Sequence, residues 1–263
     1  MSYPRSGRVT RIRKLRPADF DWLASQLSDP GAIGQWRPSG GMVPSTRIVS
    51  NAVDRCAIDC AIECLDGGTT VGVVQAYSAD LINGTAWLSV LIDERHRGLG
   101  WPIEGVMLFA GQLFIEFGFE KLYFAMSEQT FAQVGDALVF ADYEGHLRDR
   151  LMINGERCGQ VILALQRDIW VNKVRPLIES EPGAASEHPA DLHAIAIETL
   201  EAMMESGAID PSLRLADIPI DSLMLPLWIT KIETNTGTRI SSTRITRVEL
   251  GMTINEAIQT LFA

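Results

Sequence analysis

Hydrophobic and polar positions follow two different periods along the chain, and the change between them divides it into two parts. Up to about residue 170, short runs with a period of two predict β-strands. The turn signals between them are Asp66-Gly67-Gly68, Asn83-Gly84 and Asn154-Gly155, and an Asn-Gly pair is typical of an antiparallel hairpin. The strands are expected at residues 9–15, 56–64, 71–77, 85–92, 121–126, 145–151 and 159–165.

Helical periodicity separates some of these strands. One helix is predicted at residues 20–27, after Pro17 and Asp19, and another near residues 130–138. The longest helical pattern ends at Gly118, and its apolar positions are Ile103, Met107, Ala110, Phe114 and Phe117. Strands and helices together predict an α/β domain with a mixed, mostly antiparallel sheet and flanking helices.

The second part of the chain is helical throughout. Two apolar stripes predict two helices, and Thr253 with Glu256 has the spacing of a capping box before a third. We therefore expect an all-α four-helix bundle at residues 191–263. The stripes are formed by Leu192, Ile195, Ala196, Leu200 and Met203, and by Leu225, Trp228, Ile229 and Ile232.

A linker is predicted between the two parts. Residues 175–191 read RPLIESEPGAASEHPAD, with much Pro, Gly, Ala, Ser and Glu and no apolar period. We expect one domain at residues 1–175, a flexible linker at 176–190 and a second domain at 191–263.

Charge and composition exclude some functions. The 263 residues carry a net charge of −10, and residues 186–263 hold 5 basic against 11 acidic side chains. Such a charge argues against nucleic-acid binding, and no apolar run is long enough for a membrane span, so we expect a cytoplasmic protein. Six basic residues lie before Pro17, either as the solvated edge of a strand or as a docking patch for an acidic partner.

The cysteines do not predict a metal site. Cys56, Cys60 and Cys64 recur every fourth residue, but zinc sites commonly pair their cysteines as C-x2-C and have histidines nearby. We interpret these residues as small apolar side chains that pack in a strand.

A glycine-rich loop lies between a predicted strand and a predicted helix. It reads Arg95-His96-Arg97-Gly98-Leu99-Gly100. Glycines allow backbone N–H groups to converge, a helix N-terminus adds partial positive charge, and two arginines add full charges. The loop is therefore a candidate site for a phosphate or pyrophosphate.

With this loop the first part resembles the GNAT superfamily of N-acetyltransferases over residues 9–170. R-x-x-G-x-G is that superfamily's loop for the pyrophosphate of acetyl-coenzyme A. The segments 117–122 and 143–149 and the strand that runs to Trp170 are similar to the branch that acetylates ribosomal proteins. The resemblance implies that Arg95, Arg97, Gly98, Leu99, Gly100 and Trp101 bind acetyl-CoA or another acyl-CoA. It also implies that the strand at 85–92 splays from its neighbour and that the backbone N–H near Ile92 polarises the thioester.

The sequence does not decide which residues transfer protons. Asp93, Glu94 and His96 lie near the expected reaction centre, either as proton acceptors or as a solvated loop. Tyr143 and Tyr123 are candidates for the tyrosine that protonates the departing thiolate, or packed aromatic residues. Residues 127–131 read Ser-Glu-Gln-Thr-Phe, where the family usually has an Asn and then a Ser.

Ser222 is the second candidate site. Ile220-Asp221-Ser222-Leu223 precedes an apolar helical stripe, and Asp and Ser are also the commonest helix N-caps. In an acidic, helical segment behind a linker, this sequence resembles acyl and peptidyl carrier proteins over residues 190–263. Pro219 and Pro226 depart from that pattern. The resemblance implies that a phosphopantetheinyl transferase attaches 4'-phosphopantetheine covalently to Ser222.

Three functions remain. The first is a transferase that moves an acyl group from CoA to the carrier's thiol, or to an amine tethered on it, in polyketide or nonribosomal-peptide biosynthesis. Downstream biosynthetic enzymes would then dock the carrier. In the second, a carrier-bound acyl group moves to a free amine, and a decarboxylating variant on malonyl thioesters is a further possibility. The third is a non-catalytic docking domain.

Overall fold

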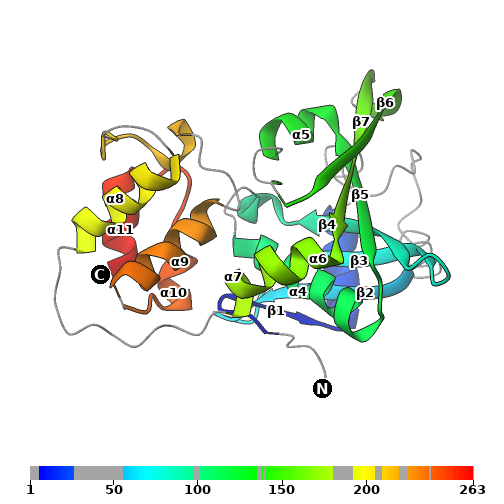
Figure 1. Cartoon of the computed structure of the whole chain (residues 1–263), viewed down its shortest axis with the longest axis horizontal. Coiled ribbons are helices and arrows are strands. Elements are labelled where there is room, and N and C mark those ends of the chain that lie inside the picture. The colour runs from blue at the N-terminus through cyan, green and yellow to red at the C-terminus, as the bar shows by residue number, and fades with distance from the viewer. Residues whose placement is uncertain are drawn as a thin grey trace.

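The computed structural model describes residues 6–26, 56–97, 101–134, 138, 140–153, 155–179, 192–204, 209–218, 224–236 and 238–262. Its first part is one sheet with helices on both faces, and its last part is helical (Figure 1). The strands are β1 (Thr10–Arg13), β2 (Cys56–Cys64), β3 (Thr70–Asp80), β4 (Thr85–Ile92), β5 (Lys121–Ser127), β6 (Asp142–Ile153) and β7 (Glu156–Gln166).

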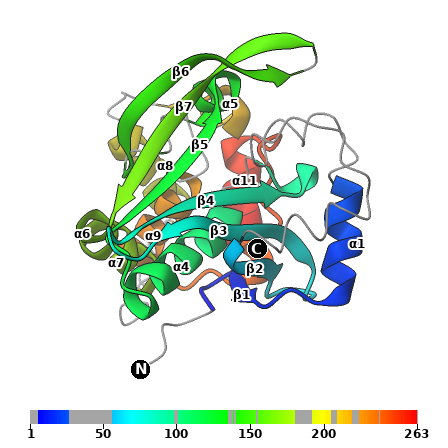
Figure 2. The ribbon, with the colours of Figure 1, turned by 90° about the vertical axis from the view of Figure 1, so that its right-hand side faces the viewer.

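The seven strands lie in the order β1-β2-β3-β4-β5-β7-β6. All neighbouring pairs are antiparallel except β4 and β5, which are parallel and joined through the long helix α4 (Trp101–Glu116). The mixed, mostly antiparallel sheet with flanking helices is therefore confirmed. Figure 2 shows the β6–β7 hairpin projecting away from the rest of the sheet.

Helix α4 covers one face of the sheet and packs very close to β2. It is buried around most of its circumference, and it contacts β1, β2, β3 and α7 (Arg175–Glu179). Gly105 permits this approach, because a Cβ there would lie 2.4 Å from Cγ2 of Ile62. On the opposite face, Leu23 of α1 (Pro17–Gln26) packs on Val73 and Leu91.

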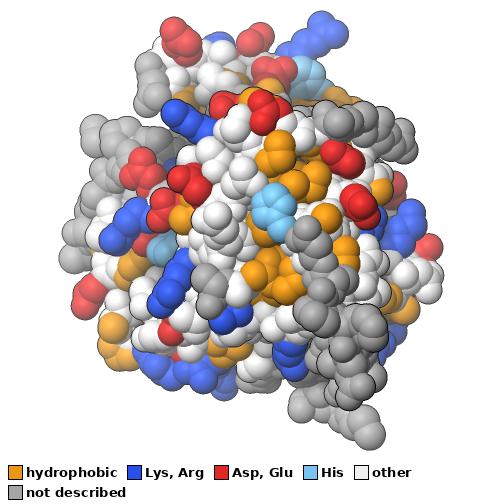
Figure 3. Space-filling view, turned by 90° about the vertical axis from the view of Figure 1, so that its left-hand side faces the viewer, with side chains coloured by type: hydrophobic (Ala, Val, Ile, Leu, Met, Phe, Trp, Pro, Cys, Tyr) orange, Lys and Arg blue, Asp and Glu red, His pale blue; other side chains and the backbone are white. Residues whose placement is uncertain are grey.

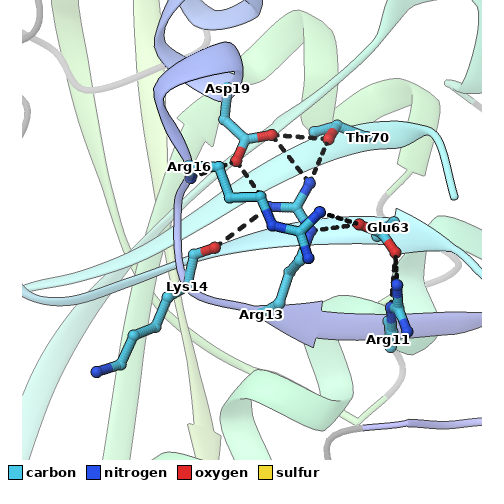
Figure 4. Close-up of polar contacts among 7 residues, drawn as sticks. All are labelled: Arg11, Arg13, Lys14, Arg16, Asp19, Glu63 and Thr70. Atoms are coloured by element: carbon cyan, nitrogen blue, oxygen red, sulfur yellow. Dashed lines mark hydrogen bonds and ion pairs between the residues drawn. The ribbon is translucent and has the colours of Figure 1, made fainter.

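A buried ionic cluster joins β1, β2 and α1 (Figure 4). Arg13 pairs with Glu63 and, at 2.7 Å, with Asp19, whose carboxylate also accepts hydrogen bonds from the Arg16 N–H and the Thr70 hydroxyl. The Asp19 and Glu63 side chains are 3% and 1% exposed. Arg13 therefore does not belong to a solvated strand edge, as one interpretation of the basic residues expected, because it neutralises two buried carboxylates.

The first part ends in a helical segment that the sequence patterns did not predict. Segments α6 (Arg167–Ile169), η3 (Trp170–Val174) and α7 (Arg175–Glu179) continue one another. The middle segment is a π-turn in which the Arg175 N–H bonds the Trp170 carbonyl. Pro176 has no N–H to donate, and such a turn accommodates the break in the α-helical ladder. Residues 176–179, expected in the linker, are thus helical.

The last part consists of α8 (Leu192–Met204), α9 (Met224–Thr236), α10 (Ser242–Ile245) and α11 (Ile254–Phe262), which we call the helical unit. Trp228 is fully buried, and its Nε1 donates to the Ala196 carbonyl at 2.8 Å, which ties α9 to α8. The capping box is confirmed, since Thr253 and Glu256 exchange hydrogen bonds. The outward face of the molecule on this side has a central group of hydrophobic side chains with charged ones at its margins (Figure 3).

Candidate functional site

Strands β4 and β5 separate along their length. Their parallel pairing runs from Thr85 opposite Lys121 to Leu88 opposite Phe124 and stops there. After Leu88, the residues of β4 have partners on β3 alone. After Phe124, the residues of β5 have partners on β7 alone. A gap therefore opens between the carboxyl-terminal ends of the two strands, as the expected splay requires.

Two backbone N–H groups of β4 point into this gap. The Asp93 N–H donates to the Val71 carbonyl at 2.9 Å and so points toward β3. Leu91, two residues earlier and opposite Val73, directs its N–H to the same side. Because hydrogen-bonding direction alternates along an antiparallel strand, Val90 and Ile92 direct their N–H groups toward β5. The register of the described residues gives neither of them a partner on that side. This geometry suits a donor for a carbonyl oxygen.

The segment after β4 is a short 3-10 turn, η1 (Glu94–His96), capped by Asp93. The buried Asp93 carboxylate accepts the Arg95 N–H at 3.1 Å. The Arg95 side chain is 86% exposed. Arg97 instead folds back, and its Nε donates to the Ile92 carbonyl at 3.0 Å. One arginine thus faces solvent, and the other supports the end of β4.

His96 of η1 and Trp101 contact each other edge to face, with ring centroids 5.4 Å apart. Trp101 begins α4 and is 4% exposed, and its Nε1 has no hydrogen-bond partner in the described structure. The buried Nδ1 of His96 also lacks one, although Asp93 Oδ2 lies 3.7 Å away. Burial lowers the pKa of His96, and this outweighs the opposing effect of Asp93. The imidazole is therefore neutral near pH 7 and able to accept a proton.

Polar groups that the sequence patterns did not predict lie at the end of β5 and on its β7 side. Ser127 ends β5, and its hydroxyl accepts the Thr130 N–H at 3.1 Å, which caps α5 (Glu128–Val134). Glu128 pairs with His146 at 2.5 Å and accepts the Gly159 N–H at 2.9 Å. The departure at residues 127–131 was the available signal. It did not identify His146 as a partner, because that residue lies on another strand.

The remaining candidates lie in different places. Tyr143 is on the edge strand β6, 59% exposed, with its ring 6.3 Å from that of Phe131. Strand β7 separates it from β5, so it stands about 10 Å from that strand. Tyr123 stacks on Trp87 at 5.2 Å, at the closed end of the β4–β5 pair. Glu94 is exposed on η1.

Some predictions lie outside the described residues. Gly98, Leu99 and Gly100 of the loop and Ser222 are among these, so their roles stay predictions. Cys60 and Cys64 are buried, in agreement with the predicted packing role, and burial raises the pKa of the Cys64 thiol. Cys158 is buried as well. Within the described ranges, no group of three His, Cys, Asp or Glu side chains is arranged to hold a metal ion. No helix described is long and apolar enough to span a bilayer.

The sheet order and the separation of β4 from β5 are consistent with the fold of the GNAT N-acetyltransferases. Solved structures of such enzymes superpose on the chain. One is spermidine N-acetyltransferase from Vibrio cholerae in complex with CoA and spermine. It is 15% identical in sequence, the match covers 62% of this chain and 98% of that chain, and the TM-score is 0.53. A mutant of the same enzyme is 14% identical in sequence and superposes with a TM-score of 0.54, and the match covers 63% of this chain and 98% of the mutant's chain.

A third structure, described as a probable acetyltransferase, is 20% identical in sequence and has a TM-score of 0.50, and the match covers 62% of this chain and 95% of that chain. At such identities the likeness establishes the fold. No protein-family model and no curated protein matches the chain by sequence. The finer resemblances to the ribosomal-protein branch and to carrier proteins stay predictions.

Proposed function

We propose that the chain is an acyl-CoA-dependent acyltransferase joined to its own carrier domain. The acyl group would pass from CoA to an acceptor held on Ser222, either the thiol of its phosphopantetheine or an amine tethered there. The observation that carries the proposal is the gap between β4 and β5, into which Val90 and Ile92 direct their N–H groups. The fold shared with CoA-dependent N-acetyltransferases supports this choice of donor.

The residues present fit a CoA donor. The unpartnered Trp101 Nε1 lies at the first residue of α4, where four backbone N–H groups of a helix also lack partners. The Arg95 side chain is 86% exposed and can reach a phosphate in solvent, and its Nη2 lies 3.6 Å from Asp93 Oδ2. Nη1 and Nη2 of Arg97 have no partner among the described residues. Anions bind readily at such helix starts. These groups would hold the diphosphate, and the β4 backbone would hold the thioester end.

The reaction requires one proton to leave the acceptor and one to reach the departing thiolate. The acceptor's sulfur or nitrogen forms a bond to the acyl carbon, and the carbon–sulfur bond to CoA breaks. An N–H of Ile92 would stabilise the oxyanion between these events. His96, neutral at pH 7, would take the acceptor's proton. The departing thiolate would take its proton from the protonated His96 or from solvent.

The helical unit supports Ser222 as the acceptor position. When bound, phosphopantetheine supplies a thiol on a long, mobile chain. Helix α9 begins at Met224, two residues after Ser222, and is anchored to α8 through Trp228. The outward face with its hydrophobic centre offers a surface for downstream enzymes (Figure 3).

Calorimetry with CoA tests the donor half of the proposal. We expect the wild type to bind CoA and Arg97→Ala to bind it at least tenfold more weakly, since a charge-assisted contact is worth about 1.5–3 kcal/mol. Arg167→Ala removes a 38% exposed arginine that pairs with Glu120 outside the gap, and it should leave binding unchanged. Absence of CoA binding by the wild type would favour the non-catalytic docking domain. An acyl-loaded chain that sheds its label to a free amine would favour the reverse direction of transfer.

A further inference from the structure

An ion pair connects the helical unit to the α/β part. Arg8 Nη2 pairs with the Glu233 carboxylate, and Arg8 Nη1 donates to the Thr230 hydroxyl at 3.3 Å. The two charged side chains are 15% and 9% exposed. Thr230 and Glu233 stand one turn apart on α9 and present a single face to Arg8. Buried hydrophobic side chains of both parts also belong to one contiguous cluster.

Both ends of this contact are held in place by other bonds. The Glu104 carboxylate accepts the backbone N–H groups of Arg8, Val9 and Thr10 at 2.8–2.9 Å, which fixes the chain that carries the arginine. Glu233 accepts the Ile240 N–H at 2.7 Å. Because both partners are positioned before they meet, little conformational entropy is lost when the contact forms.

The contact lies between the two helices that border the proposed sites. Glu104 belongs to the first turn of α4, directly after the glycine-rich loop. Met224, the first residue of α9, is nine residues before Glu233, about 14 Å along the helix axis. Arg8 therefore joins the donor-side helix to the helix that follows Ser222. Figure 1 shows the helical unit lying on the side of the sheet where β1 and α7 lie.

We propose that Arg8 is a docking residue that holds the helical unit beside α4, so that acyl transfer takes place within one chain. The surface is the corner formed by β1 and α4, and its partner is the face of α9 that carries Thr230 and Glu233 in the same molecule. This inference rests on the proposed function. Tethered units meet at effective concentrations in the millimolar range, so one charge pair with a modest apolar contact suffices for docking.

Docking is tested first without any reaction. Small-angle scattering of the full chain at low and high salt would compare wild type with Arg8→Ala, Arg8→Lys and Glu233→Gln. We expect the wild type to stay compact. Arg8→Ala should lower the ratio of docked to undocked molecules at least tenfold, because removal of one partner leaves the buried Glu233 charge without its cation. Lysine should restore part of the docking. The control is Arg16→Ala, whose side chain is 62% exposed and lies 3.8 Å from Glu63.

A melting curve for each variant separates undocking from unfolding. Equal compactness of Arg8→Ala and wild type at all salt concentrations would overturn the docking contact. A larger radius of gyration with an unchanged melting temperature would support it.

Transfer within one chain is tested by mixing. A Ser222→Ala chain, which takes up no phosphopantetheine, keeps the donor site, and a holo Arg97→Ala chain keeps the acceptor. Acyl transfer within one chain predicts that a mixture acquires much less acyl mass than wild type, and that Arg8→Ala slows loading of an otherwise intact chain. Full complementation by the mixture would overturn it. If the wild type is compact but gains no acyl mass, the proposed function is wrong and the docking contact is still supported.

Discussion

Arg13→Met is the substitution that most directly examines the ionic cluster of Figure 4. Methionine keeps much of the aliphatic length and removes the guanidinium, which leaves Asp19 and Glu63 buried without their shared cation. Breaking a buried pair by removing one partner costs about 3–5 kcal/mol. We expect a loss of that size in the free energy of unfolding at pH 7, measured by urea titration with circular dichroism.

The pH dependence of this loss gives a second, independent signature. Burial alone would raise the pKa of Asp19 and of Glu63, but their hydrogen bonds, those from Arg13 first, lower both below the usual values of about 3.9 and 4.3. The wild-type cluster therefore stabilises the fold above about pH 4, and this stabilisation is lost as pH falls through the lowered pKa values. In Arg13→Met the carboxyls are protonated at higher pH, so the cost relative to wild type should shrink between pH 7 and pH 4.

Arg16→Ala is the matched control, because its guanidinium is mostly exposed and should contribute less than about 0.5 kcal/mol. Arg11 continues to pair with Glu63 in the variant, so the loss falls mainly on Asp19. A cost below about 1 kcal/mol at pH 7, or a cost that does not change with pH, would refute the reasoning.

Three further outcomes follow from the packing and the site. Gly105→Ala forces a Cβ against Ile62 and should cost about 1–3 kcal/mol in thermal unfolding, whereas an unchanged melting temperature would contradict the close approach of α4 to β2. Trp228→Phe removes the bond to the Ala196 carbonyl and should cost about 1–3 kcal/mol, seen as loss of hydrogen-exchange protection in α8 and α9 together. His96→Gln should abolish the decline of kcat/KM below about pH 6.5, because the wild-type imidazole has a lowered pKa and loses its base form only in acid; an identical profile would exclude His96 as the base.

Local patterns predicted most of the elements because they depend on neighbours in sequence. The turn at Asn83-Gly84 is an example, with Gly84 at φ +66° and Asp80 accepting the N–H groups of Ile82 and Asn83. The capping box of Thr253 and Glu256 is another, since both partners lie within one helical turn. Such features are visible in a single sequence.

Contacts between distant residues could not be predicted in the same way. Arg8 meets Glu104 and Glu233, which are 96 and 225 residues away. Glu128 meets His146 only because the start of α5 and strand β6 both lie beside β7. Charge and hydropathy give each of these residues many possible partners, and only the fold selects one.

Intact-mass spectrometry of the full chain, co-expressed with a phosphopantetheinyl transferase and then given acetyl-CoA, tests the central claim most directly. The account predicts that the wild type gains one phosphopantetheine and then one acetyl group, and that Ser222→Ala gains neither. A wild type whose mass stays that of the bare polypeptide, or a Ser222→Ala chain that is loaded equally well, would contradict it.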